Sequence, residues 1–141
     1  MIASVMCLAM AVYFEARSEP IIGRYAVAEV IMNRTRDNRF PDTVCAVVKH
    51  DMGPEEFACQ FSFTCDGKSD KPADPMAWDM AVALAEDVLL NGHTTYYTGS
   101  ALFYHAKGVN QKWDDHMVTT AVIGNHVFMS EPVRLADTSG D

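Results

Sequence analysis

One carboxylic acid in this sequence stands where it can be expected to keep its proton near neutral pH. Glu15 follows an apolar run, Ile2 to Phe14, that contains no charged residue. If that run is a helix, Glu15 lies at its C-terminal end, where the helix dipole disfavours a carboxylate. The neighbouring aromatic rings can also remove water from the carboxyl group. Both effects raise the pKa, and an acid with a raised pKa is suited to general acid catalysis.

The alternative interpretation is an ordinary glutamate at the end of a helix, held in an ion pair with Arg17 or Arg24. A nearby guanidinium lowers the pKa of a carboxyl group instead of raising it. The spacing of these residues leaves both interpretations open.

A conventional glycosidase needs a second carboxyl group about 5 to 9 Å from the first. Three residues are candidates: Glu19, Glu29 and Asp66. Pro20 is expected to end the helix at Glu19, and Asp66 is typical of a turn. Glu29 is interleaved with the apolar face of a second helix, and we expect it to be a structural partner for Arg17. The sequence therefore favours one catalytic acid over two.

Four helices are expected to position these groups. The first spans residues 3–17, and residues 21–23 connect it to the second, residues 24–36, whose apolar positions form one stripe. A short third helix begins after a cap at Asp42 or Thr43 and runs to residue 49. The fourth begins at Asp74-Pro75, runs to Leu90 and ends at Asn91-Gly92.

Period-two alternation predicts a strand over residues 56–65, ended by the turn sequence Asp66-Gly67. The segments 94–105 and 119–129 are rich in β-branched and aromatic residues and predict short strands. The sum is an α+β fold, mostly helical, with a small β-hairpin region. We expect a single domain over residues 1–130 and a flexible polar tail over 131–141.

Composition excludes several functions. The 141 residues carry 11 basic and 19 acidic side chains, a net charge of −8, which argues against nucleic-acid binding. The apolar run at the N-terminus is too short to span a bilayer. It lacks a basic flank, so we interpret it as a buried helix and not as a signal peptide. The histidines do not have metal-ligand spacing, and no metal or cofactor is expected.

The four cysteines permit two disulfides, which suits an oxidising compartment. In an extended strand Cys59 and Cys65 would lie roughly 20 Å apart, too far for a disulfide. Either that segment bends sharply, or these two cysteines pair with Cys7 and Cys45.

Several blocks of the sequence, in order over residues 5 to 129, resemble the spore-cortex-lytic type of cell wall hydrolase. The first block contains Tyr13-Phe14-Glu15-Ala16-Arg17-Ser18-Glu19-Pro20, followed by Asn33-Arg34. The others are Phe40-Pro41, Val44-Cys45-Ala46-Val47-Val48, Cys59-Gln60-Phe61-Ser62-Phe63-Thr64-Cys65-Asp66-Gly67, Phe103-Tyr104-His105-Ala106, Trp113 and Ile123-Gly124-Asn125-His126-Val127-Phe128.

The resemblance implies a lysozyme-like fold and cleavage of the glycan strands of peptidoglycan, with Glu15 as the catalytic residue. It implies the chemistry of a lytic transglycosylase, in which one residue protonates the glycosidic oxygen and then deprotonates the C6 hydroxyl of N-acetylmuramic acid. The alternatives are a hydrolytic muramidase and a catalytically idle peptidoglycan-binding or structural module.

By the same resemblance the segment around residue 60 borders the sugar cleft. The candidate substrate-binding residues are Gln60, Phe61, Ser62, Tyr104 and His105. Tyr104 and His105 are expected to contact sugar or to orient Glu15, with plain packing as the alternative. We expect a monomer that acts on peptidoglycan in the periplasm, the cell envelope or outside the cell. A phage-encoded endolysin is compatible with the sequence.

Overall fold

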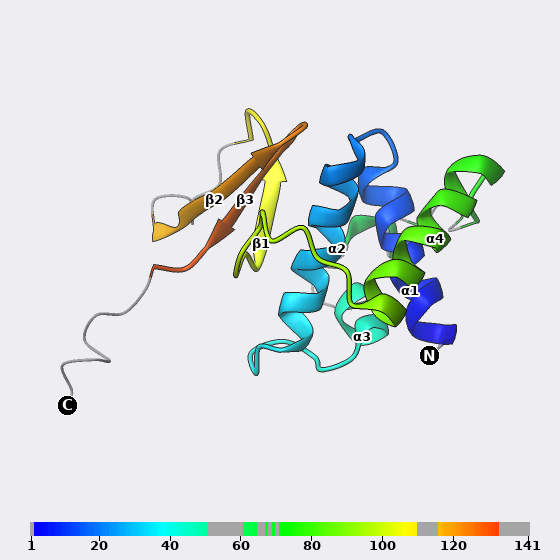
Figure 1. Ribbon diagram of the computed structural model, residues 1–141, viewed down its shortest axis with the longest axis horizontal. Helices are drawn as coiled ribbons and strands as arrows, with labels where there is room; N and C mark the ends of the chain where they lie inside the picture. The colour runs from blue at the N-terminus through cyan, green and yellow to red at the C-terminus, as the bar shows by residue number, and fades with distance from the viewer. Residues whose placement is uncertain are drawn as a thin grey trace.

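A group of helices forms one side of the molecule and a small antiparallel sheet forms the other (Figure 1). This computed structural model describes residues 2–50, 61–64, 67, 69, 71–109 and 116–132. The helices are α1 (Ile2–Ala16), α2 (Ile21–Thr35), α3 (Val44–Val48), the 3-10 helix η1 (Ser62–Thr64) and α4 (Pro75–Asn91). The strands are β1 (Phe103–Ala106), β2 (Val118–Ile123) and β3 (His126–Ser130). This arrangement confirms the predicted mostly helical α+β class.

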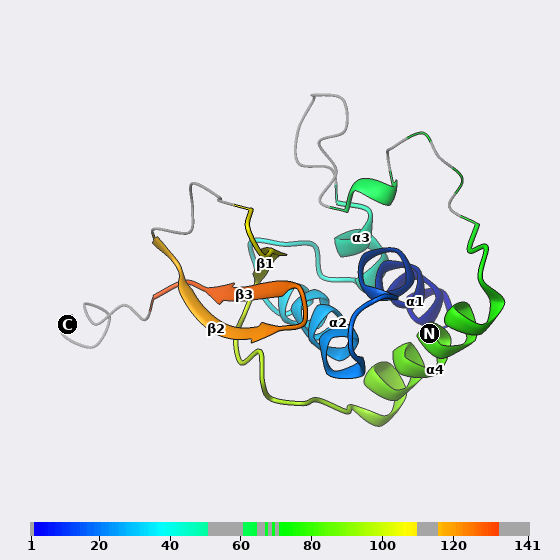
Figure 2. The ribbon, with the colours of Figure 1, turned by 90° about the horizontal axis from the view of Figure 1, so that it is seen from above.

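Helix α1 lies at the centre of the helical layer, with α2, α3 and α4 packed around it (Figure 2). Its lack of charge follows from this position, because a helix surrounded by others must be apolar on most of its surface. Leu8, Val12 and Tyr13 are fully enclosed. The prediction of a buried domain helix is confirmed. In the described residues, none of the helices combines the length and the apolar character that a membrane span requires.

Helix α2 begins three residues before its predicted start. The segment Ile21 to Gly23, expected to be a connector, is the first turn of the helix. Pro20 occupies the N-cap with an extended backbone, so the proline that ends one helix also precedes the next. Gly23 packs closely there, since a Cβ atom would lie 3.3 Å from Cβ of Glu19, which is a tight contact, and 3.5 Å from Cγ2 of Ile123, which is an ordinary one.

The predicted caps of the other helices are confirmed. The Thr43 hydroxyl accepts a hydrogen bond from the amide of Ala46 at the start of α3. At the start of α4 the Asp74 carboxylate accepts one from the amide of Ala77, and Gly92 ends this helix in the left-handed region with φ of 67°.

The strand predicted over residues 56–65 is wrong where the structure describes it. Phe61 to Thr64 forms a bend followed by η1, and the hydroxyl of Thr64 donates to the carbonyl oxygen of Phe61 at 2.8 Å. Such a local bond competes with strand pairing. The alternating aromatic residues Phe61 and Phe63 are instead both buried in the core. Residues 51–60 and 65–66 lie outside the described residues.

The sheet has the strand order β1-β3-β2, with both pairs antiparallel. The segment predicted as a strand over 119–129 is a hairpin of β2 and β3, joined by a turn at Gly124 and Asn125. Of the other predicted segment, 94–105, only the end from residue 103 is a strand. Residues 94–101 form an irregular connection that crosses from α4 to the sheet (Figure 1).

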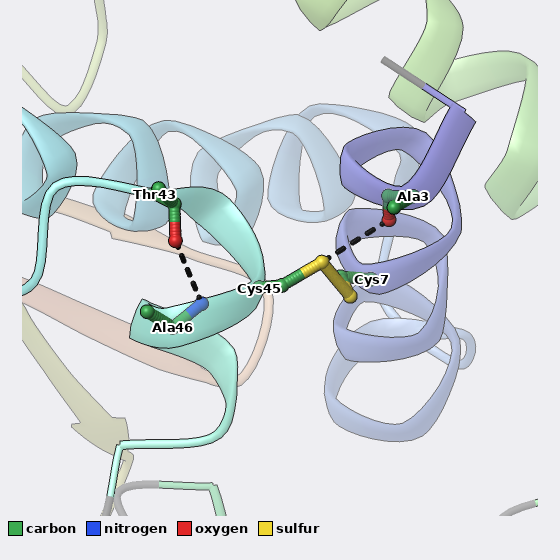
Figure 3. The surroundings of a disulfide bond; sticks show 5 residues. All are labelled: Ala3, Cys7, Thr43, Cys45 and Ala46. Atoms are coloured by element: carbon green, nitrogen blue, oxygen red, sulfur yellow. Dashed lines mark hydrogen bonds between the residues drawn. A yellow bond between two sulfur atoms is a disulfide. The ribbon is translucent and has the colours of Figure 1, made fainter.

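A disulfide joins Cys7 of α1 to Cys45 of α3, with the Cα atoms 5.2 Å apart (Figure 3). Sγ of Cys45 also lies 3.2 Å from the carbonyl oxygen of Ala3. A disulfide sulfur carries no hydrogen, so this is a polar contact and not a donated bond. This pairing excludes the two connectivities in which Cys7 and Cys45 each join Cys59 or Cys65. Cys59 and Cys65 lie outside the described residues.

We expect the double variant Cys7→Ser/Cys45→Ser to be less stable than the parent by about 3 to 4 kcal/mol. The reason is that the bond closes a loop of 38 residues in the unfolded chain. Urea unfolding of the two oxidised proteins measures the difference. Coincident unfolding curves would contradict a stabilising role for this bond.

Candidate active site

Glu15 lies in the last turn of α1 and faces the sheet. Its Oε1 accepts a hydrogen bond of 2.8 Å from the hydroxyl of Tyr104, on β1. The two residues are 89 positions apart in the sequence. The fold therefore brings together two residues that are far apart in the sequence, and this is the contact expected if Tyr104 orients Glu15.

Burial raises the pKa of Glu15 above its ordinary value, and the hydrogen bond from Tyr104 lowers it by less. The net direction is the one that the sequence predicted. The ion pairs of the alternative interpretation are not formed, since among the described residues both arginines have other contacts. Arg17 donates to the hydroxyl of Tyr13 and lies over its ring, and Arg24 donates to the carbonyl oxygen of Glu19 at 2.9 Å.

Tyr104 is a permanent hydrogen-bond donor in this site. Burial and the nearby Glu15 carboxylate hold its pKa well above the ordinary value of 10. Its ring is 4.9 Å from that of His126 and 5.6 Å from that of Phe128, its partner on β3. Two aromatic neighbours and the strand pairing thus fix where the hydroxyl points.

A buried guanidinium supports the same region, and sequence analysis did not assign it a role. Arg34 of α2 is 1% exposed, and its Nε donates to the carbonyl oxygen of Leu102 at 2.7 Å. The rings of Phe40, Phe61 and Phe103 lie 5.2 to 5.7 Å from its guanidinium carbon. Burial lowers its pKa to about 10, so it stays charged at neutral pH. This charge lowers the pKa of nearby Tyr104, by less than burial raises it.

The chain before β1 is held to α2 by Asn33, the residue beside Arg34. Its amide donates to the carbonyl oxygens of Gly99 and Ala101 at 3.0 and 2.9 Å. The signal that could have shown this is a polar pair, Asn33-Arg34, at the end of an otherwise apolar helical stripe. Such a pair needs buried partners.

Both described candidates for a second carboxylate are held by hydrogen bonds to other groups. Glu29 accepts hydrogen bonds from the amide and hydroxyl of Thr95 and from the hydroxyl of Thr98, at 2.7 to 3.1 Å. The expectation that it pairs with Arg17 was wrong, because it anchors the connection between α4 and β1. Glu19 accepts from the amide of Asn125 at 2.7 Å. Asp66 lies outside the described residues.

The other predicted substrate-binding residues have different positions. His105 follows Tyr104 on β1, so it faces the other side of the strand, and its Nδ1 lies 2.8 Å from the carbonyl oxygen of Ala106. Phe61 is 1% exposed and packs beside Arg34, so its ring is a core element with no open face for a sugar. Ser62 begins η1, and Gln60 lies outside the described residues.

Helix η1 is nevertheless close to the end of α1. The ring of Phe63 stacks on that of Phe14, the residue before Glu15, with centroids 4.8 Å apart. The end of α1 is therefore in contact with two other segments, with η1 through Phe14 and with β1 through Glu15. All three belong to the blocks on which the family resemblance was based.

A mostly helical α+β domain with a carboxyl group of raised pKa at the junction of helices and sheet fits an enzyme that cuts polysaccharides by acid catalysis. Residues 18–129 match the model of the family described as Cell Wall Hydrolase. The chain belongs to this family, which confirms the resemblance. The match begins three residues after Glu15, so the role of Glu15 is supported by its geometry and not by this match.

Solved structures and curated relatives agree with this family assignment. The catalytic domain of the germination-specific lytic transglycosylase SleB from Bacillus anthracis has a TM-score of 0.66 and 33% identity, covering 90% of this chain and 93% of that one. The catalytic domain of the Bacillus cereus SleB protein has a TM-score of 0.67 and 32% identity, covering 92% and 91%. A spore cortex-lytic enzyme of Oceanobacillus iheyensis is 52% identical over 126 residues.

This chain is shorter than its curated relatives. Matches cover 88% of it but only 40% of the Oceanobacillus protein and 43% of a spore cortex-lytic enzyme of Bacillus cereus, which is 34% identical. These relatives are bacterial, and they give no support to the endolysin interpretation.

Replacing Tyr104 by Phe removes one hydroxyl and keeps the ring. Because that hydroxyl lowers the pKa of Glu15, we expect the pKa of Glu15 to rise further and the basic limb of the pH–rate profile to move to higher pH. The rate at the optimum should fall roughly ten- to a hundredfold, the value of a hydrogen bond to a charged group. Turbidity loss of purified peptidoglycan between pH 4 and 9 measures both. A limb that moves to lower pH would contradict this assignment.

Glu15→Gln should become more stable relative to the parent as the pH rises. A carboxyl group whose folded pKa is raised binds more protons in the folded state, so it loses stability as the pH rises from the unfolded pKa through the folded pKa. Glutamine removes this loss and can still accept from Tyr104. Urea unfolding at pH 4 and pH 8 tests the sign, and exposed Glu86→Gln is the matched control.

Proposed function

We propose that this domain cuts the glycan strands of peptidoglycan between N-acetylmuramic acid and N-acetylglucosamine as a lytic transglycosylase with one catalytic residue, Glu15. The observation that carries the proposal is the partly buried Glu15, which accepts a hydrogen bond from Tyr104 and whose pKa is raised by burial. Among the described residues, Glu19 and Glu29 accept hydrogen bonds from backbone and hydroxyl groups elsewhere. The name of the Bacillus anthracis relative supports the same chemistry.

In the first step the protonated Glu15 gives its proton to the glycosidic oxygen that follows N-acetylmuramic acid. The bond from that oxygen to C1 breaks, and N-acetylglucosamine leaves as an alcohol. Positive charge develops at C1 and its ring oxygen, and Glu15 becomes a carboxylate. The O–H of Tyr104 stabilises this new charge, because a hydrogen bond to a charged acceptor is stronger than one to a neutral acceptor.

In the second step the Glu15 carboxylate takes the proton of the C6 hydroxyl of the same muramic acid. The C6 oxygen forms a bond to C1 and closes a 1,6-anhydro ring. Glu15 is protonated again, and no water is consumed. One residue thus acts as acid and then as base, which requires a pKa close to the working pH in both steps.

Hydrolysis is the second candidate reaction. It would need a carboxylate to activate water or to attack C1. The described glutamates near the end of α1 have other partners, and for this reason we favour the anhydro product. A peptidoglycan-binding module without catalysis is disfavoured by the raised pKa of Glu15, since burying a carboxyl group lowers stability and binding alone does not require it.

The products of digestion test the mechanism. We expect purified peptidoglycan treated with the parent domain to yield 1,6-anhydromuramic ends, detected by mass spectrometry 18 Da below the hydrolysed product. Glu15→Gln should yield none, and Glu86→Gln should match the parent.

Each other outcome has a clear meaning. Reducing muramic ends would contradict the transglycosylase and establish a muramidase. Binding of peptidoglycan without cleavage by either the parent or Glu15→Gln would establish the binding module.

The relatives named spore cortex-lytic enzymes suggest where such a domain acts. We propose that its partner is peptidoglycan of the bacterial cell wall or spore cortex, outside the cytoplasmic membrane. The disulfide between Cys7 and Cys45 suits that oxidising location. A monomeric state remains our prediction.

A further inference from the structure

The carboxylate of Glu19 holds the β2–β3 turn against the segment between α1 and α2. Its Oε1 accepts the amide hydrogen of Asn125 at 2.7 Å, across 106 positions in the sequence. The backbone of Glu19 is itself fixed, because its amide donates to the carbonyl oxygen of Ala16 at 2.9 Å and its carbonyl oxygen accepts from Arg24 at 2.9 Å. One rigid carboxylate thus binds one backbone amide.

Gly124 is the residue that makes this contact possible. It has φ of +57°, which favours glycine. A Cβ atom there would lie 2.5 Å from Oε1 of Glu19 and 2.8 Å from Cδ of Pro20. A larger residue would force the turn and the Glu19 carboxylate apart, because one of them would have to shift. The turn and the loop are therefore shaped for each other on both sides.

From this turn the contacts lead back to the catalytic carboxyl group. His126 follows Asn125, and its Nδ1 lies 3.7 Å from Oε1 of Glu19. Both side chains are enclosed, at 12% and 11% exposure. The ring of His126 meets that of Tyr104 edge to face at 4.9 Å, and Tyr104 donates to Glu15. A displaced turn would move His126, and with it the ring of Tyr104 and the hydroxyl group that donates a hydrogen bond to Glu15.

The surroundings of His126 favour its neutral form. Nδ1 is buried without a hydrogen-bond partner among the described residues. Burial lowers the pKa of His126, the Glu19 carboxylate opposes this and nearby His105 adds to it. The groups that face this ring are Glu19 from the α1–α2 segment and Tyr104 from β1. His105 lies on the other face of β1 and acts on the pKa of His126 through its charge. A neutral ring packs on Tyr104 without placing a cation beside Glu15.

We infer that Glu19 is a positioning residue for Glu15, which acts by fixing the β2–β3 turn and, through His126, the hydroxyl of Tyr104. The inference rests on the proposed function for its kinetic readout, but its structural readout is independent of the reaction. Glu19 touches neither the substrate nor the reacting atoms in this account. Its effect must therefore pass through Tyr104.

A double-mutant cycle tests this dependence. We expect Glu19→Ala to lower the rate of peptidoglycan lysis roughly ten- to a hundredfold, because a small displacement of a catalytic contact costs this much. In the Tyr104→Phe background the same change should cost less than about threefold, since the hydroxyl that Glu19 positions is already absent. Equal losses in the two backgrounds would overturn the inference.

Titration of Glu15 gives the second readout. In protein with 13C-labelled glutamate carboxyl groups, Glu19→Ala should raise the pKa of Glu15, as Tyr104→Phe should, because both weaken the same donated bond. A merely structural role would lower the folded fraction and leave this pKa unchanged, and that result would overturn the inference. If the proposed reaction fails but the titration shifts, the positioning role stands and the activity assignment alone fails.

Two further variants separate fold from position. Glu19→Gln keeps an oxygen that can accept from Asn125, and we expect it to restore the lysis rate to within about fivefold of the parent. Gly124→Ala keeps Glu19 but separates the turn from it, and should reproduce the raised pKa of Glu15 even if Glu19→Ala does not fold. Parent-like titration of Glu15 in Gly124→Ala would contradict the inference.

Discussion

The hydrogen bond between Tyr104 and Glu15 is the contact on which the proposed chemistry depends. It joins the last turn of α1 to the first antiparallel pair of the sheet, and so requires the helical layer and the sheet to meet in one arrangement. Each of the surrounding interactions holds one of the two partners, either Glu15 on α1 or Tyr104 on β1. The buried α1 and the Cys7–Cys45 bond fix the acid, while Arg34, Asn33 and the β2–β3 turn fix the tyrosine.

Such a site lowers the stability of the protein that carries it. A carboxyl group with a raised pKa is destabilising at neutral pH, and a buried guanidinium needs aromatic and carbonyl neighbours to compensate for the loss of water. Enclosed apolar side chains on α1 and α2 and the covalent link between α1 and α3 offset this cost. The stabilising interactions lie beside the site, and the free-energy cost of partly desolvating Glu15 and Arg34 arises within it.

Local patterns predicted what local physics determines. The caps at Thr43 and Asp74 follow from residues within one helical turn. The buried first helix and the acid at its end follow from one continuous apolar run. Tertiary contacts decided the rest. The partner of Glu29 lies 66 to 69 positions away in the sequence, so no spacing rule identifies it. The alternation around Phe61 predicts a strand, but core burial in a bend and a 3-10 helix produces the same pattern over four residues.

The early start of α2 has a similar explanation. Pro20 predicts the end of the first helix, and a proline also suits the position at the start of a new helix, which it occupies here. Gly23 has a low helix propensity, which makes a helix start at Ile21 hard to predict. The close packing of Gly23 against Glu19 and Ile123 cannot be read from the sequence. The blocks that resemble the family contain Glu15, Tyr104 and the β2–β3 turn. Their spacing along the sequence does not indicate which of these residues are in contact.

The most direct test of this account is the pKa of Glu15 in the parent domain, measured by NMR titration of its labelled side-chain carboxyl carbon and assigned by comparison with Glu15→Gln. We predict a midpoint above the ordinary value of 4.5, because burial outweighs the hydrogen bond from Tyr104. A midpoint at or below 4.5 would show a solvated or ion-paired carboxylate, and would contradict the claim that one residue serves as acid and then as base.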